Sequence, residues 1–291
     1  MDLRIPGLLV GHWTEPEAQT GVTVIVLPEG STASGEVRGG APATREFALL
    51  DPRCLVDRVD AVVLSGGSAF GLAAADGVVS ALEEAGRGFP TAAGPVPIVI
   101  GMSLYDLNVG DASTRPGAEQ GRLAFDAASA DSTTGRVGAG TGATIGKWRG
   151  PEHVLPGGFG VSTVCRGDLL VTALVAVNSA GDVGEVGAAV ASRIADGSFD
   201  EWPDRSEVFA NTTIGAVVTN AALDKSQCLV VAEGCHDGLA RVITPPHMRT
   251  DGDAFVAAAS GVVEAHVDDV RLAAMVAVEQ AVMLGVDTLN G

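Results

Sequence analysis

The stretch FANTTIG, residues 209–215, lies where a hydrophilic linker gives way to an apolar run, residues 214–218, that is typical of a β-strand. Two hydroxyl residues therefore stand at a strand start, next to a peptide bond that could be cut. If the chain breaks between Asn211 and Thr212, Thr212 gains an α-amine whose ordinary pKa is roughly 7.7–8.0. One residue would then hold both a nucleophile and its base, as in N-terminal-threonine catalysis.

Two other interpretations of this stretch compete with catalysis. Three small polar residues often cap a strand, and Asn211-Thr212-Thr213 also fits the N-x-[ST] pattern for N-glycosylation. Glycosylation requires a secretory route, and we expect no signal peptide, because the first apolar run is interrupted by Asp2 and Arg4. The strand-cap interpretation can be weighed only against the rest of the chain.

Composition excludes several classes of partner. Hydrophobic residues make up 46 % of the 291 residues and aromatic residues only 4 %, so a substantial core must be filled mainly by Ala, Val and Gly. The formal net charge of −18 argues against nucleic acid and anionic membrane surfaces as partners. No run of ~18 uncharged apolar residues indicates a membrane span. We therefore expect a cytoplasmic protein.

Neither a metal site nor a cofactor site is expected. The five histidines show no metal-ligand spacing, and the four cysteines form no CxxC pair, so we interpret the cysteines as buried free thiols of a cytosolic protein. Residues 138–143 formally satisfy G-x-G-x-x-A, but no clear strand precedes them and no helix pattern follows, so a dinucleotide site is not predicted. Gly66-Gly67 is compatible with a phosphate cradle, but we interpret these glycines as a tight strand-to-helix turn.

The apolar patterns predict an α/β fold in layers. Short runs typical of strands alternate with longer runs at helical spacing. Strands are expected at 22–27, 61–64, 96–100, 157–164, 169–177, 214–218 and 254–259, and helices at 69–85, 123–130, from 224 onwards and at 268–284. Residues 35–42 are interpreted as a Gly-rich loop, and residues 187–204 as an exposed connector that could tolerate a chain break at its end.

Several polar residues outside the threonine stretch are candidates for chemistry. Asp251 and Asp253 flank a glycine, where they form either a solvated turn or a pair that holds an amine and shifts each other's protonation. Asn178 follows a strand and either terminates it or donates to an oxyanion. Lys147 is one of two lysines and Tyr105 is the single tyrosine. Each of these two has an ordinary interpretation, a surface charge for the lysine and a half-buried core residue for the tyrosine.

Four motifs in this order resemble the DmpA-type peptidase family. They are GGSAFGL at 66–72, GAGTGAT at 138–144, NTTIG at 211–215 and DGDAF at 251–255, and the similarity runs over nearly the whole chain. The family contains L-aminopeptidase/D-esterases, β-peptidyl aminopeptidases and nylon-oligomer hydrolases. The Asp-Gly-Asp form resembles the nylon-hydrolase branch more than the β-aminopeptidases.

The resemblance implies a fold and a maturation step. The fold is a four-layer α/β/β/α sandwich of the DmpA/ornithine-acetyltransferase type, with a single domain over residues 1–291. The precursor is cut autocatalytically into residues 1–211 and 212–291, and the cleaved units assemble into homo-oligomers, often tetramers.

The resemblance also implies the site residues and the activity. Thr212 is the nucleophile, with Asp251 and Asp253 near its new amine, and Tyr105, Lys147 and Asn178 line the site. Substrate preference does not carry over, because the members of the family differ widely in it. From the net charge of −18 and the paired carboxylate, we expect an aminopeptidase-like hydrolase of short peptides or amides with a free amine, without a cofactor. The alternatives are an acyltransferase of the ornithine-acetyltransferase type, a nylon-oligomer-like endo-amidase, and a non-enzymatic oligomeric binding protein.

Overall fold

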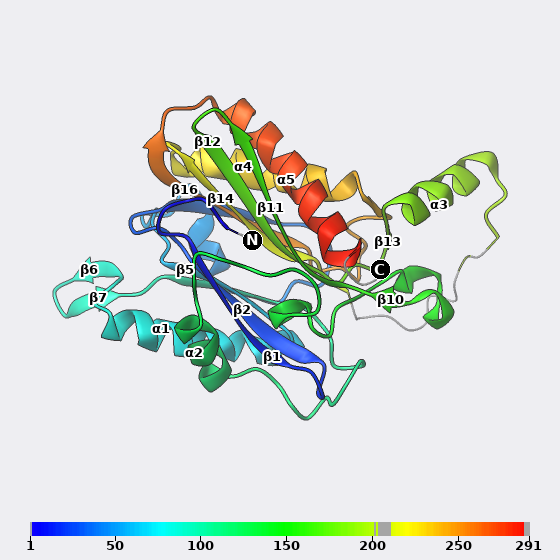
Figure 1. Cartoon of the computed structure of the whole chain (residues 1–291), viewed down its shortest axis with the longest axis horizontal. Helices are drawn as coiled ribbons and strands as arrows, with labels where there is room; N and C mark the ends of the chain where they lie inside the picture. Colours follow the sequence, from blue (N-terminus) through cyan, green and yellow to red (C-terminus); the bar gives the residue numbers. More distant parts are fainter. Residues whose placement is uncertain (1, 201, 203–210, 288–291) are drawn as a thin grey trace.

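Two five-stranded sheets organise the chain (Figure 1), whose computed structural model describes residues 2–200, 202 and 211–287. The first sheet has the strand order β1 (Leu9–Glu15), β2 (Thr20–Val26), β5 (Ala61–Ser65), β8 (Val99–Ser103) and β4 (Thr44–Arg45). The second has the order β11 (Gly158–Arg166), β12 (Leu169–Val177), β14 (Ile214–Ala221), β16 (Ala254–Val263) and β3 (Thr32–Val37). The expectation of a mixed α/β chain is confirmed.

Each sheet carries a pair of helices. The helices α1 (Ala74–Glu84) and α2 (Ala118–Asp126) share one apolar core with the first sheet. The helices α4 (Lys225–Ala240) and α5 (Val267–Asp287) share another with the second sheet. The helix α3 (Glu185–Asp196) projects from the body of the molecule instead (Figure 1).

A third apolar core joins the two sheets. It contains residues of β5 and β8 from the first sheet and of β12, β14 and β16 from the second. Successive side chains of a strand point to opposite faces, and β14 shows the consequence: Val217 packs with the α4/α5 core, whereas Ala216 and Val218 pack with the other sheet. Because both faces are covered, β14 is buried along its whole length, and its first five residues, 214–218, are all apolar or glycine.

Shorter elements complete the described chain. The two-stranded ribbons pair β6 (Phe89–Thr91) with β7 (Gly94–Val96), β9 (Thr144–Ile145) with β10 (Leu155–Pro156), and β13 (Asp182–Val183) with β15 (Ile243–Thr244). The 3₁₀ helices are η1 (Phe47–Leu50), η2 (Ser68–Ala73), η3 (Gly138–Gly140), η4 (Lys147–Arg149) and η5 (Pro151–His153). Within the described ranges, no helix combines the length and the apolar character that a membrane crossing requires.

Two local predictions are confirmed by hydrogen bonds. Asp224 caps α4 reciprocally: its carboxylate accepts from the Gln227 amide at 2.8 Å, and the Gln227 side chain accepts from the Asp224 amide at 2.9 Å. The turn at Gly67 has φ of 79°, and its N–H donates to Asp106 at 2.7 Å. That N–H is thus used by a buried carboxylate of the chain itself, which leaves the turn as the explanation of these glycines.

Two predicted irregular stretches contain regular structure. Residues 35–42 were expected to form a loop, but Gly35 lies within β3, where an added Cβ would come within 2.8 Å of Leu50 and Phe47. The glycine therefore permits close packing there instead of a turn. The first part of the expected connector at 187–204 is helical, since α3 extends to Asp196. Residues 201, 203 and 204 of that connector lie outside the described residues.

Other predictions need correction in detail. The helix expected at 123–130 starts earlier and ends earlier, as α2 (Ala118–Asp126). The cysteines are all free, as expected, but only Cys228 and Cys235 are buried, whereas Cys54 and Cys165 are exposed. The apolar pattern of the sequence predicts where strands and helices lie, but it does not predict whether a given cysteine beside them is buried or exposed.

Candidate active site

Strand pairing gathers the candidate residues at one edge of the second sheet. The strand β14 runs antiparallel to β12 and parallel to β16, with Ile214 opposite both Ala176 and Ala254. The residues before β14, after β12 and before β16 therefore meet at the same end. These residues include Thr212, Asn178 and the Asp251/Asp253 pair.

Thr212 is buried and held on both sides. Its backbone N–H donates to the carbonyl oxygen of Asn178 at 2.8 Å, and its hydroxyl donates to the carbonyl oxygen of Asn211. Gly252 lies against it so closely that a Cβ at that position would be 2.9 Å from the Thr212 Oγ1. In the uncut chain, the hydroxyl thus faces the peptide bond that was predicted to break.

Lys147 lies at the same edge, with its Nζ within hydrogen-bond distance of four oxygen atoms that share its three N–H groups. Its Nζ donates to Asn178 Oδ1 at 2.9 Å and O at 3.2 Å, and to Thr144 O at 2.6 Å and Oγ1 at 3.1 Å. Burial lowers the pKa of Lys147 to about 7, although Asp251 and Asp253 act in the opposite direction. A lysine with this pKa is partly neutral near pH 7 and can then accept a proton.

The two carboxylates have different partners. Asp253 accepts from the backbone N–H of Thr213 at 2.7 Å and pairs with His247 Nδ1 at 2.8 Å. Asp251 accepts from the backbone N–H groups of Met248 at 2.7 Å and Ala180 at 3.2 Å. Burial, together with the nearby negative charge of Asp253, raises the pKa of Asp251 to about 7.

Asn178 and Tyr105 are oriented differently from their expected roles. Asn178 is fully buried; its Oδ1 accepts from Lys147 and from the Thr144 N–H at 2.9 Å, and its Nδ2 donates to the backbone carbonyl of Tyr105 at 3.1 Å. The Tyr105 hydroxyl donates to Asn108 at 3.0 Å. Tyr105 therefore reaches the candidate site through its backbone carbonyl.

Asn211, on the other side of the predicted cleavage point, is also buried. Its Nδ2 donates to Thr250 Oγ1 at 3.2 Å, while its Oδ1 has no hydrogen-bond partner among the described residues. This side chain links the residue before the cut to the loop that carries Asp251.

Two site residues escaped the sequence analysis, Thr144 and His247. Thr144 belongs to the GAGTGAT motif, which supports the family resemblance and does not predict a dinucleotide site, but neither argument gives Thr144 itself a role. The histidines were assessed only for metal-ligand spacing, and no group of three His, Cys, Asp or Glu in the described ranges is arranged to hold a metal. His247 could have been identified from its position, because it lies shortly before the Asp pair in the segment between β15 and β16.

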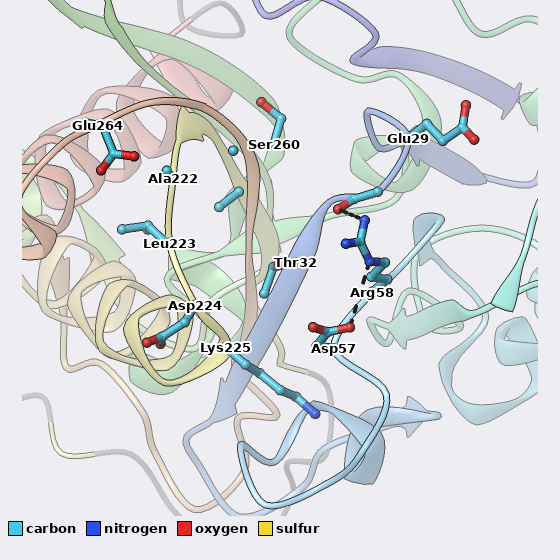
Figure 2. A pocket seen from close by; sticks show the side chains of 13 residues that line it. Glu29, Thr32, Asp57, Arg58, Ala222, Leu223, Asp224, Lys225, Ser260 and Glu264 are labelled. Carbon is cyan, nitrogen blue, oxygen red and sulfur yellow. Dashed lines mark hydrogen bonds and ion pairs between the residues drawn. The ribbon is translucent and has the colours of Figure 1, made fainter.

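A surface depression of about 600 Å³ lies at the other end of the second sheet (Figure 2). It is lined by Ala222, next to the end of β14, so roughly 25 Å of strand separates it from Thr212. Its cations already serve the chain: Lys225 donates to three backbone carbonyls, and Arg58 donates to Gly30 at 2.9 Å. None of the candidate residues lines it.

Comparison with known proteins identifies the family. The sequence profile of peptidase family S58 matches residues 3–288. An uncharacterized aminopeptidase of Mycobacterium leprae is 43 % identical over 90 % of this chain and 78 % of its own length. A 6-aminohexanoate-oligomer endohydrolase of Kocuria sp. is 30 % identical over 87 % of this chain and 72 % of its own length.

A solved structure shows the same fold at low sequence identity. The L-aminopeptidase D-Ala-esterase/amidase of Ochrobactrum anthropi, described as a variant of the Ntn-hydrolase fold, superposes with a TM-score of 0.73 at 20 % identity. The superposition covers 97 % of this chain and 84 % of that one. The resemblance to the DmpA-type family is confirmed, and the chain belongs to peptidase family S58.

Proposed function

We propose that this protein is a self-processing amidohydrolase with Thr212 as its N-terminal nucleophile, and that it acts as an aminopeptidase on short peptides or amides. The observation that carries the proposal is the position of the Thr212 hydroxyl, which donates to the carbonyl of the preceding residue at the sheet edge where Lys147, Asn178 and the Asp pair meet. Membership of a peptidase family and 43 % identity to an aminopeptidase support the reaction class.

Self-cleavage follows from this geometry in two steps. The Thr212 Oγ1 attacks the carbonyl carbon of Asn211, the C–N bond breaks, and the proton lost by the hydroxyl passes to the released amine. Water then hydrolyses the ester between Asn211 and the Thr212 oxygen. The products are a chain that ends at Asn211 and a chain that begins with the free amine of Thr212.

The mature site repeats this attack on a substrate. The Thr212 hydroxyl adds to the substrate carbonyl while its own amine accepts the proton and then passes it to the leaving amine. Water releases the acyl group and restores the hydroxyl. Lys147, held by Asn178, supplies positive charge near the oxygen of the tetrahedral intermediate.

The acidic site favours a substrate with a positive amino group. A carboxylate within ~4–6 Å of an ammonium stabilises the charged forms of both, and Asp251 and Asp253 lie beside Thr212 with Lys147 as the nearby cation. The net charge of −18 also steers cations toward the protein at low salt. We therefore propose that a free amine close to the scissile amide is part of what the enzyme recognises.

Hydrolysis of an aminoacyl p-nitroanilide and of its N-acetylated twin tests this proposal. We expect faster hydrolysis of the free amine, with the difference shrinking at high salt. Thr212→Val should abolish activity, whereas Thr213→Val is the matched control, because the Thr213 hydroxyl has no hydrogen-bond partner among the described residues. Equal activity of the two variants would show that the wrong threonine has been assigned.

An endo-amidase is the second candidate function. It is favoured by 30 % identity to a 6-aminohexanoate-oligomer endohydrolase. In that case the blocked substrate would be hydrolysed as fast as the free amine, because an internal amide presents no adjacent ammonium. The same assay therefore separates the two functions.

We propose that the fragments 1–211 and 212–291 stay together as one α/β/β/α domain after the cut. Two of the three apolar cores support this arrangement, because residues of both fragments share them. We also propose that cleaved units assemble into a homo-oligomer, such as a tetramer, which sedimentation of the purified protein would test.

A further inference from the structure

His247 makes a hydrogen bond to Asp253 of the candidate site, and the proposed reaction gives this histidine no role. Its Nδ1 lies 2.8 Å from Asp253 Oδ2, and the side chains of the pair are 16 % and 3 % exposed. Its Nε2 is buried and has no hydrogen-bond partner among the described residues. The backbone of His247 adopts φ of 50°, which is uncommon for a residue other than glycine. The polar contacts of this ring are therefore directed to Asp253 alone.

The proton between His247 and Asp253 belongs on the ring. The geometry places a ring nitrogen of His247 against one oxygen of Asp253 and a backbone N–H against the other. An ionised carboxylate only accepts hydrogen bonds, and Nδ1 must then donate. The other oxygen of Asp253 accepts from the Thr213 N–H at 2.7 Å. Both oxygens of Asp253 are thus occupied by donors, which favours its ionised form.

Asp251 differs, because burial disfavours its ionised form and, among the described residues, its oxygens accept hydrogen bonds from backbone groups alone. Its partners are the backbone N–H groups of Ala180 and Met248. An ionised Asp253 nearby disfavours a second negative charge on Asp251. The pair therefore holds one negative charge firmly at Asp253.

The charged and titratable groups around the His247–Asp253 pair come from three elements and the loop after β3. Lys147 of η4 acts on the carboxylates of Asp251 and Asp253, and His236 of α4 contacts the His247 ring. Behind His236 lie Asp237 of α4, Glu36 of β3 and Arg38, which pairs with both of these carboxylates. The His236 ring packs edge-to-face against the His247 ring with centroids 5.0 Å apart, and its Nε2 donates to the Glu36 carbonyl at 3.1 Å. Burial lowers the pKa of His236 to about 3, so this neighbouring ring is neutral. No charge on His236 competes with the His247–Asp253 pair.

We infer that His247 is a positioning residue that keeps Asp253 ionised, so that Asp251 is the member of the pair that gains and loses a proton. Asp253 then serves as a fixed anion that holds the Thr213 amide, and with it Thr212. Asp251 serves as the proton-exchanging carboxyl group beside the nucleophile. The inference rests on the proposed site and assigns different roles to two carboxylates that the sequence left equivalent.

Infrared titration of the uncut Thr212→Ala precursor tests the inference without requiring self-cleavage or hydrolysis. A protonated carboxyl group has a C=O band distinct from that of a carboxylate, and a buried one titrating near pH 7 stands apart from surface carboxyl groups. Burial also raises the pKa of Asp106, so the parent is compared with Asp251→Asn, and we expect that variant to lose one protonated carboxyl group per chain. Absence of this band, or an undiminished band in Asp251→Asn, would overturn the inference.

Two substitutions of His247 complete the test. His247→Asn keeps an N–H donor close to the Nδ1 position, whereas His247→Leu removes it at similar size. In the Asp251→Asn background, we expect no additional protonated carboxyl group with His247→Asn and one additional group, at Asp253, with His247→Leu. Identical titrations of the two variants would contradict a role for the donor. Thermal unfolding of each variant verifies that the compared proteins are folded.

Discussion

Replacement of Gly252 by alanine should disable the candidate site by steric displacement alone. An added Cβ would lie 2.5 Å from the Ala41 carbonyl oxygen, 2.9 Å from the Pro42 Cα and 2.9 Å from the Thr212 Oγ1. Two of these atoms belong to the backbone, so the Thr212 side chain or the loop itself must move. The shift needed to restore ordinary contacts is roughly 0.5–1 Å.

The magnitude follows from that displacement. Overpacking a well-packed site costs about 1–3 kcal/mol of stability, and misplacing a reacting group by about 1 Å can reduce a rate on the order of 100-fold. We therefore expect Gly252→Ala to fold with a modestly lower unfolding midpoint, and to cut itself and hydrolyse substrate about 100-fold more slowly. The rate effect should exceed the stability effect.

The assay measures the fraction of cut chain against time, together with p-nitroanilide hydrolysis and thermal unfolding. The matched control is Gly117→Ala, where the added Cβ would meet only the Gln120 side chain, at 3.4 Å. Unchanged cutting and hydrolysis in Gly252→Ala would refute the placement of Gly252 against the nucleophile. Equal losses in the two variants would mean that the effect is one of stability.

Three further predictions concern buried charges. In the Asp251→Asn background, the free energy of unfolding should rise between pH 7 and 10.5, because Lys147 has a pKa of about 7 in the folded chain and 10.5 in the unfolded chain, which therefore binds more protons in this range. Urea unfolding measures this rise, which has a slope of at most roughly 1.4 kcal/mol per pH unit. Lys147→Met should remove it, and a slope that survives the substitution would contradict the low pKa. Asp182→Asn should lower the free energy of unfolding by about 3 kcal/mol in the same assay, because the buried Asp182 carboxylate accepts from the Arg149 guanidinium at 2.7 and 2.9 Å. A loss below about 0.5 kcal/mol would show that this ion pair does not stabilise the fold. Lys225→Met should lower the free energy of unfolding by about 3 kcal/mol, because the Nζ of Lys225 donates to three backbone carbonyls. These carbonyls lie far from Thr212, so the hydrolysis rate should not change, and a selective loss of activity would contradict this structural role.

Local apolar patterns predicted most strands, and the family resemblance selected residues that the structure brings together at one sheet edge. Apolar runs such as residues 169–177 form strands wherever a core covers them, and the helix cap at Asp224 is a matter of residues three apart. Motif order placed Thr212 and the Asp pair in one site. The register that joins them, with β14 between β12 and β16, arises from pairing between distant segments and has no local signal.

The errors arose where tertiary packing overrides composition. Glycine favours turns, which predicts a loop at Gly35, yet this residue lies in β3. A glycine is required at this position of the strand because Phe47 and Leu50 leave no room for a Cβ. Likewise, small residues concealed the helical pattern of α3, of which only Gly187 and Val190 are buried. His247 and the backbone role of Tyr105 depend on side-chain direction, which spacing does not specify.

The intact mass and N-terminal sequence of the purified protein test the central claim most directly. The account predicts two chains, residues 1–211 and 212–291, with the second beginning at Thr212, and a single uncut chain for Thr212→Val. A catalytically active preparation that consists only of the uncut chain, or a new N-terminus at any residue other than Thr212, would contradict the assignment of the nucleophile.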